Sequence, residues 1–102
     1  PGLMARLFTD AEVRTPDGKP RSGESLAARF CAKEALAKAL GSPGGMSWLD
    51  AEVTTLPNGA PELVIRGTVA ARAAECEVAK IHLSLSHDGG LATAFVICEG
   101  KT

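Results

Sequence analysis

The hydrophobic spacing of this 102-residue chain changes after Gly41, and this change limits its possible folds more than any other feature. Apolar residues in 25–40 have the spacing of a helix, which Gly41 and the Pro and Gly residues behind it would end. The later runs 48–56 and 80–87 alternate between apolar and polar residues, as half-buried strands do. A chain of this length fits one domain, so the sequence predicts a single α+β domain.

Segments rich in turn residues divide the rest of the chain into short elements. We expect Ser22 or Ser25 to cap the long helix, Thr68 to cap a later one, and 91–99 to be a buried strand. The expected order is a short helix at 4–13, the helix at 25–40, a hairpin of 48–56 and 62–67, a helix at 68–78, and a hairpin of 80–87 and 91–99. This order favours a mostly antiparallel sheet packed against the long helix.

Composition and charge argue against several classes of function. The formal net charge is −1, and the basic residues are not interleaved with aromatic ones, so we expect no nucleic-acid partner. No apolar run approaches the roughly 18 residues of a membrane span, so we expect no membrane partner. The three cysteines form no CxxC pair, which indicates reduced thiols and a cytoplasmic protein.

The centre of the long helix, "RFCAKEALAKALG", carries the first candidate site residues. Glu34 and Lys38 fall on one helical face together with Leu26 and Phe30. On an exposed surface, Glu34 and Lys38 would form an ordinary i,i+4 ion pair. We expect this face to pack on the sheet instead, where a carboxylate is costly unless a cation or a metal ion holds it, and this would make it a site.

The strand "IHLSLSHD" carries the second candidate set. Its alternation puts His82, Ser84 and Ser86 on one face, with His87 at the end, as on many exposed sheet surfaces. A Ser-His hydrolase is an alternative, but the sequence has no GxSxG turn for a nucleophile. The Gly-rich segment 41–45 follows a helix and does not match a phosphate-binding loop, and the Cys and His residues lack the spacing of a zinc site.

Three sequence blocks together resemble one known family. The long-helix block, "DAEV…NGAPEL" and "HLSLSHD…A.AFVICE" are similar in order and spacing to the holo-acyl-carrier-protein synthases, the small bacterial branch of the 4′-phosphopantetheinyl transferase superfamily. The opening "RLFTDAE" resembles the FT..E segment of the same family, so the likeness covers the whole chain. It implies a Mg²⁺-dependent enzyme that moves the phosphopantetheine arm of coenzyme A to a serine of apo acyl carrier protein and releases adenosine 3′,5′-bisphosphate.

The resemblance also implies roles for individual residues. Glu34 matches the metal-binding glutamate of the family, Lys38 matches a lysine that holds a coenzyme A phosphate, and Lys33 is a second candidate beside them. His87 matches a histidine near the pyrophosphate and the incoming serine, so the expected catalytic set is Glu34, Lys38 and His87. The residues expected to bind coenzyme A are Lys33, Lys38, Gly41, Asn58, Gly59, Pro61, Ser86 and His87.

One part of the family pattern has no counterpart in this sequence. Family members begin with a strand of the "GIGID" type, whose aspartate is the other protein ligand of the metal, so we expect residues 1–102 to be one domain that lacks its first strand here. Members are commonly homotrimers with the active site between subunits, and their carrier protein is acidic. Arg6, Arg14 and Arg21 are candidates for contacting that carrier.

A different class of function stays open at this point. A non-catalytic module that binds a carrier protein or coenzyme A is the alternative, which the unmatched aspartate favours. Mg²⁺ and Mn²⁺ are both compatible with these residues, as are carriers for fatty acid and polyketide synthesis. The serine proton could pass to water, to Glu34 or to a residue outside this sequence.

Overall fold

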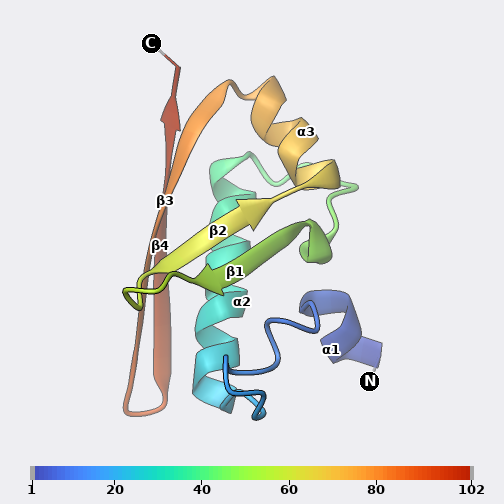
Figure 1. Cartoon of the computed structure of the whole chain (residues 1–102). Coiled ribbons are helices and arrows are strands. Elements are labelled where there is room, and N and C mark those ends of the chain that lie inside the picture. Colours follow the sequence, from blue (N-terminus) through green and yellow to red (C-terminus); the bar gives the residue numbers. More distant parts are fainter. Residues whose placement is uncertain (1, 102) are drawn as a thin grey trace.

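The computed structural model describes residues 2–101 and confirms the predicted α+β class and order of elements (Figure 1). None of the helices in this range combines the length and the apolar character that crossing a bilayer requires. The first helix is shorter than predicted, and a 3₁₀ turn precedes the first strand. The elements are α1 (Gly2–Leu7), α2 (Gly23–Ala39), η1 (Trp48–Asp50), β1 (Ala51–Thr55), β2 (Pro61–Ile65), α3 (Gly67–Glu75), β3 (Val78–Asp88) and β4 (Leu91–Gly100).

The two ends of α2 follow from their local sequence. Ser22 is the N-cap, because its side-chain oxygen accepts a hydrogen bond from the Ser25 N–H at 3.1 Å. Gly41 follows the helix with φ +87°, a left-handed conformation that glycine adopts without steric cost. The Ser42 N–H then bonds back to the Ala37 carbonyl at 2.7 Å and closes the last turn. Of the two predicted caps, Ser22 is therefore the correct one.

Two antiparallel hairpins surround α2. The β1–β2 register pairs Val53 with Leu63, and the β3–β4 register pairs Leu85 with Ala94. Figure 1 shows α2 running along the length of the β3–β4 hairpin, with the β1–β2 hairpin crossing the helix obliquely. The contacts of α2 are most extensive with β4, and β2 lies next to β3. The predicted helix-on-sheet packing is thus confirmed, although the strands form two separate pairs.

The core lies between α2, the hairpins and α3. Its buried members are Ala32, Leu36, Leu40, Ala51, Val53, Leu63, Val69 and Ala73. The inward residues of β3 and β4 are half-buried against this cluster, and they include Ile81, Leu83 and Leu85, as the alternation predicts. Removing these apolar side chains from water supplies the main stabilisation of such a layer.

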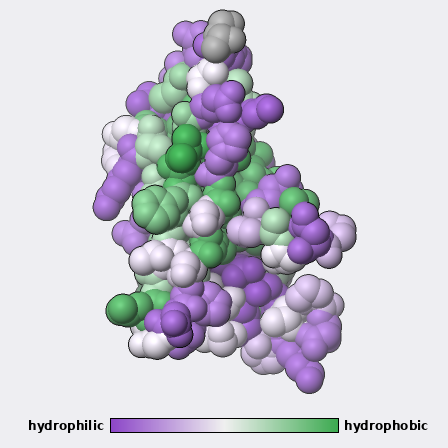
Figure 2. All heavy atoms as spheres, turned by 90° about the vertical axis from the view of Figure 1, so that its left-hand side faces the viewer, coloured by the Kyte–Doolittle hydropathy of each residue, from purple (hydrophilic) through white to green (hydrophobic). Residues whose placement is uncertain are grey.

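The prediction that 91–99 is a buried strand is wrong for the single chain. One face of β4 packs against α2. Within residues 2–101, nothing packs on the other face of the β3–β4 hairpin. Phe95 is 73% exposed and Ile97 is 63% exposed on that outer face. Figure 2 looks toward this side of the molecule and shows hydrophobic side chains between hydrophilic ones. Clusters of exposed apolar side chains are typical of interaction surfaces.

The start of α3 is stabilised by a residue that the sequence did not single out. One carboxylate oxygen of Asp50 accepts hydrogen bonds from the Thr68 N–H at 2.8 Å and from the Thr68 hydroxyl at 2.6 Å. The Thr68 oxygen in turn accepts the Ser47 N–H at 2.9 Å. The predicted Thr68 cap is therefore wrong in detail, since Asp50 from η1 holds the helix end and Thr68 joins it to the preceding loop.

The Asp50 carboxylate gives a test of this arrangement. The Thr68 hydroxyl, and then the Thr68 N–H, lower the pKa of Asp50 below its ordinary value of 3.8. Because the folded pKa is depressed, Asp50 contributes stability above that ordinary value and loses it as the pH falls through the folded pKa. NMR titration should show a depressed carboxyl pKa, and D50N should lower the Tm at neutral pH. D10N, on an exposed turn, is the control, and an undepressed Asp50 pKa would contradict the assignment.

Candidate functional site

A polar pocket of about 390 Å³ forms where α2, the β1–β2 turn and the end of β3 meet. Its lining residues are Arg29, Thr55, Gly59, Pro61, Leu85, Ser86 and His87. Four of these residues were predicted from the sequence, and they come from two segments that are far apart along the chain. The fold therefore brings the turn residues Gly59 and Pro61 together with Ser86 and His87.

The turn side of the pocket has a defined backbone shape. The Asn58 side-chain oxygen accepts the Ala60 N–H at 3.0 Å, a local bond typical of Asn in turns. Gly59 has φ +88°, which only glycine adopts freely. Asn58 itself is exposed and shapes the turn from outside the pocket lining.

Arg29 is the one arginine in the pocket lining, and the sequence analysis missed it. The residue is 6% exposed, and its two terminal nitrogens donate to Ser25 and to the Thr55 hydroxyl. Its Nε–H is buried and has no hydrogen-bond partner within residues 2–101. Burial lowers the pKa of the guanidinium, Arg21 adds to this effect, and Glu12 opposes it, yet an arginine stays charged at neutral pH.

A buried cation that lines a polar pocket is suited to binding an anion. A buried polar group without a partner costs free energy, and native structures seldom leave one unexplained. Phosphate oxygens are suitable acceptors, because guanidinium groups bind them through charge-assisted hydrogen bonds. The signal that could have identified Arg29 is its place at the head of "RFCAKEALAKALG", four residues before Lys33, so that both lie on the same helical face.

His87 stands at the open side of the pocket and is half-exposed. Its Nδ1 lies 3.4 Å from a carboxylate oxygen of Glu24 at the start of α2. The other histidine, His82, contacts Glu99 at 2.9 Å on the outer face of the hairpin. Within residues 2–101 neither histidine bonds to a serine, so the Ser-His hydrolase alternative receives no support from the geometry.

Glu34 and Lys38 lie on the outer face of α2, and not on the face that packs against the sheet. Both are exposed, whereas Leu26 and Phe30 of the same stripe are half-buried. The predicted orientation of this stripe is therefore wrong. The physical reason is that the inward face consists of Ala28, Arg29, Ala32, Lys33 and Leu36, where two buried cations find partners in other elements. Within residues 2–101 Glu34 takes part in no salt bridge, so the ordinary ion-pair interpretation also fails.

Lys33 is buried and is not available to a phosphate group. Its ammonium group donates to the Leu7 carbonyl at 2.7 Å, to Glu12 Oε1 at 2.6 Å and to the Trp48 carbonyl at 3.1 Å. An ammonium has three N–H donors, so all of them are used. The prediction of Lys33 as a coenzyme A ligand is therefore wrong, because the side chain is part of the interior.

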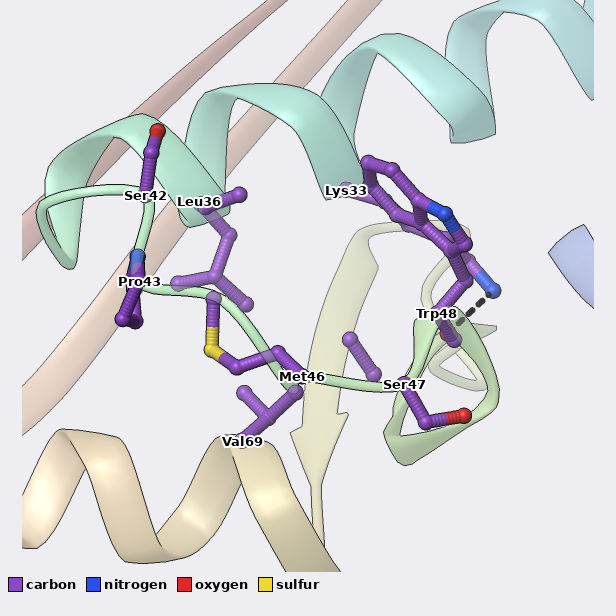
Figure 3. Close-up of a pocket in the computed structure, with 10 residues that line it drawn as sticks. Lys33, Leu36, Ser42, Pro43, Met46, Ser47, Trp48 and Val69 are labelled. Atoms are coloured by element: carbon purple, nitrogen blue, oxygen red, sulfur yellow. Dashed lines mark hydrogen bonds between the residues drawn. The ribbon is translucent and has the colours of Figure 1, made fainter.

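The second cavity of interest, of about 240 Å³, opens beyond the C-terminal end of α2 (Figure 3). Its walls are mainly apolar and include Leu36, Pro43, Met46, Trp48 and Val69. Lys33 also lines this cavity, but its ammonium group is already hydrogen-bonded to the Trp48 carbonyl, as the dashed line in Figure 3 shows. The cavity therefore offers no free cation for an anionic ligand. The predicted residue Gly41 serves as the helix end next to it, as described above.

Glu34 can bind a magnesium ion only together with ligands from outside residues 2–101. No three His, Cys, Asp or Glu side chains come together as a metal-binding group in the described part of the chain. Mg²⁺ nevertheless commonly uses one or two carboxylates and completes its octahedron with water and substrate phosphates. An exposed carboxylate with no partner is therefore compatible with such an ion.

The chain matches the family model of the 4′-phosphopantetheinyl transferase superfamily over residues 1–96. It therefore belongs to that superfamily. It is 60% identical to a holo-[acyl-carrier-protein] synthase of Salinispora arenicola, over 97% of this chain and 81% of that protein. Identity at this level and coverage place the chain among the holo-[acyl-carrier-protein] synthases, as the sequence resemblance implied.

Solved structures support the same family and the same fold. The holo-[acyl-carrier-protein] synthase of Helicobacter pylori in complex with coenzyme A superposes with a TM-score of 0.80 at 26% identity, covering 96% of this chain and 82% of that one. A synthase of Bacillus anthracis in complex with coenzyme A (3′,5′-ADP) gives a TM-score of 0.75 at 35% identity, with 98% and 82% coverage. The transferase fold predicted from the sequence is confirmed.

The polar pocket predicts a measurable anion affinity. R29Q removes the buried cation, and we expect it to weaken the binding of pyrophosphate about tenfold or more, in line with a charge-assisted hydrogen bond of more than about 1.4 kcal/mol. Isothermal titration calorimetry measures this change. R66Q is the matched control, because Arg66 is half-exposed and pairs with Glu52 on the surface. Equal affinities of R29Q and the wild type would show that the pocket is not an anion site.

Proposed function

We propose that this chain transfers the 4′-phosphopantetheine arm of coenzyme A to a serine of apo acyl carrier protein and releases adenosine 3′,5′-bisphosphate. Membership of the synthase family supports this reaction, and two of the related structures contain coenzyme A. The observation in this chain that carries the proposal is the buried cation of Arg29, which lines the same polar pocket as residues of the family's turn and histidine segments.

The pocket binds the phosphates of the nucleotide end of coenzyme A. Arg29 supplies the positive charge of this pocket, and the Ser86 hydroxyl and the His87 ring add hydrogen-bond donors at the same site. The serine of the carrier attacks the phosphorus that bears the pantetheine, and the bond to the nucleotide phosphate breaks. Such a phosphoryl transfer depends mainly on positioning and on neutralising charge, which these residues supply.

Glu34 and Lys38 provide the second group of residues, on the outer face of α2. Glu34 would hold the magnesium ion, together with water and the diphosphate of coenzyme A. When bound, the ion neutralises charge on the diphosphate and orients it for attack. Lys38, one turn further along the helix, contacts a phosphate of coenzyme A. Residues 1–102 span about four fifths of the matched relatives, and we take them as one domain whose other metal carboxylate lies outside this sequence.

The complete site requires a second copy of the chain. Glu34 and Lys38 point outward on α2. Arg29 and His87 line the polar pocket, whereas Glu34 and Lys38 are not part of its lining. A homotrimer that brings the outer face of α2 from one subunit to the pocket of its neighbour would combine the two groups. The exposed apolar face of the β3–β4 hairpin, with Phe95 and Ile97, supports such an assembly.

The acidic carrier protein is proposed to dock near α1. Arg6 is exposed on that helix and is free for such a contact. Arg21 is less suitable than predicted, because its guanidinium group already donates to the Glu12 carbonyl, to the Ser25 hydroxyl and to the Arg14 carbonyl. The fatty acid pathway in the cytoplasm is the proposed setting.

The direct test incubates the full-length protein with coenzyme A, Mg²⁺ and an apo acyl carrier protein. The mass of the carrier should rise by about 340 Da, the mass of the transferred arm, and a carrier without the acceptor serine should stay unchanged. Binding of coenzyme A without any gain in mass would support the alternative, a non-catalytic coenzyme A or carrier-binding module.

E34Q is the matching variant for the metal site. It removes charge at nearly constant shape, so we expect turnover and its Mg²⁺ dependence to be lost while the Tm stays near that of the wild type. E75Q, an exposed carboxylate on α3, is the control. Retained turnover together with a lower Tm would make Glu34 a structural residue.

A further prediction concerns the assembly. The double variant F95S/I97S should shift sedimentation from trimer to monomer and abolish transfer, because it removes apolar surface from the proposed contact and separates the two groups of residues. L3S is the control, since Leu3 is equally exposed but lies on α1. A trimeric double variant, or a monomeric wild type that is fully active, would contradict the proposed assembly.

A further inference from the structure

The interior of the domain contains an ion pair that the proposed reaction does not use. Lys33 on α2 and Glu12 lie 2.6 Å apart, and both side chains are 0% exposed. The ammonium group also lies 5.3 Å from the centre of the Phe8 ring. Two buried charges are costly unless all of their hydrogen-bonding capacity is met, and here it is met by four different segments.

Each partner of the pair connects α2 to another part of the fold. Lys33 donates to the Leu7 carbonyl at the end of α1 and to the Trp48 carbonyl in η1. Glu12 Oε1 accepts the Thr9 N–H at 2.9 Å, and Glu12 Oε2 accepts the Val53 N–H of β1 at 2.8 Å. The pair therefore fixes α2 simultaneously to α1, η1 and the edge of β1. Figure 3 shows the bond from Lys33 to the Trp48 carbonyl of η1.

The apolar residues of α2 only partly decide which face turns inward. Leu36 is buried in the core, but the other buried apolar residues, Ala28 and Ala32, remove little apolar area from water. The helix also buries Arg29 and Lys33. The directional bonds of these two cations, together with the burial of Leu36, therefore set the rotation of the helix about its axis.

This rotation decides where the proposed ligands of the metal and the phosphate lie. Successive residues of a helix are about 100° apart, so a Lys33 that is held inward directs Glu34 to the outer surface. Lys38 lies on that same outer face, one turn further along. A rotation of α2 large enough to release Lys33 would move both side chains away from their present positions.

We propose that the Glu12–Lys33 pair is a positioning element for the transfer reaction, because it fixes the rotation of α2 and so the placement of Glu34 and Lys38. This inference rests on the proposed function for the roles of those two residues. Neither Glu12 nor Lys33 is a catalytic residue, since both side chains are buried and their donors and acceptors are paired inside the protein.

The test uses E12Q and the double variant E12Q/K33M in the full-length protein. The amide of E12Q has one acceptor where the carboxylate had two, so it cannot accept from both Lys33 and the Val53 N–H. The double variant removes both charges and keeps the experiment informative if E12Q does not fold, because no unpaired charge is left in the interior. At a temperature where the variants are folded, kcat should fall about tenfold or more and the KM for coenzyme A should rise severalfold, because Glu34 and Lys38 both leave their positions.

Two measurements do not depend on activity. The affinity for Mn²⁺ in the presence of coenzyme A, followed by electron paramagnetic resonance, should fall about tenfold in both variants, because Glu34 is displaced. A crystal structure of E12Q/K33M should show α2 rotated relative to β1. V69A is the matched control: it weakens the core at α3 without removing a hydrogen-bond partner of the pair, and should lower the Tm without changing Mn²⁺ affinity.

The outcomes separate this inference from the proposed function. If the wild type transfers no arm, the proposed function fails, while the crystal structure of the double variant still tests the positioning of α2. If the variants lose Tm as V69A does but keep wild-type kcat, Mn²⁺ affinity and helix orientation, the pair only stabilises the fold and the inference is overturned.

Discussion

The buried bond between Lys33 and Glu12 is the interaction on which the arrangement of this domain depends. It lies where α1, α2, η1 and β1 meet, and it satisfies backbone groups from three of these elements. Buried charges are not hydrated, so the protein itself must supply their hydrogen-bonding partners. The pair consequently acts as a directional constraint within a core that is otherwise built from Leu, Val and Ala side chains.

The charged residues of α2 are divided between its inward and outward faces. Arg29 and Lys33 face the interior, and Glu34 and Lys38 face outward. Lys33 meets a carboxylate within the chain, whereas Arg29 lines a polar pocket. The same helix thus contributes to the core, to an anion pocket and to an exposed acidic and basic surface. A subunit interface that combines the last two is consistent with the unpaired apolar face of β4.

Much of the fold and part of the site could be predicted without coordinates. The end of α2 at Gly41 and the inward residues of β3 follow from local steric preference and from the period of the apolar residues. The turn residues Gly59 and Pro61 and the strand residue His87 were predicted as site residues from family blocks. The structure brings them to one pocket, and their roles stay predictions. Arg29 was missed because its spacing of four residues from Lys33 shows only a shared helical face, whereas its burial and its contact with Thr55 are tertiary features.

By itself, the sequence determined the order of the elements, their periodicity and the family to which the chain belongs, because these depend on neighbouring residues and on conserved spacing within short blocks. Only the tertiary structure decided which face of α2 is buried. We expected the sheet to be faced by the stripe of Leu26, Phe30, Glu34 and Lys38. Instead, Lys33 points inward, because its ion-pair partner Glu12 lies in the interior. That partner is 21 residues away in the chain, and no local pattern contains such a contact.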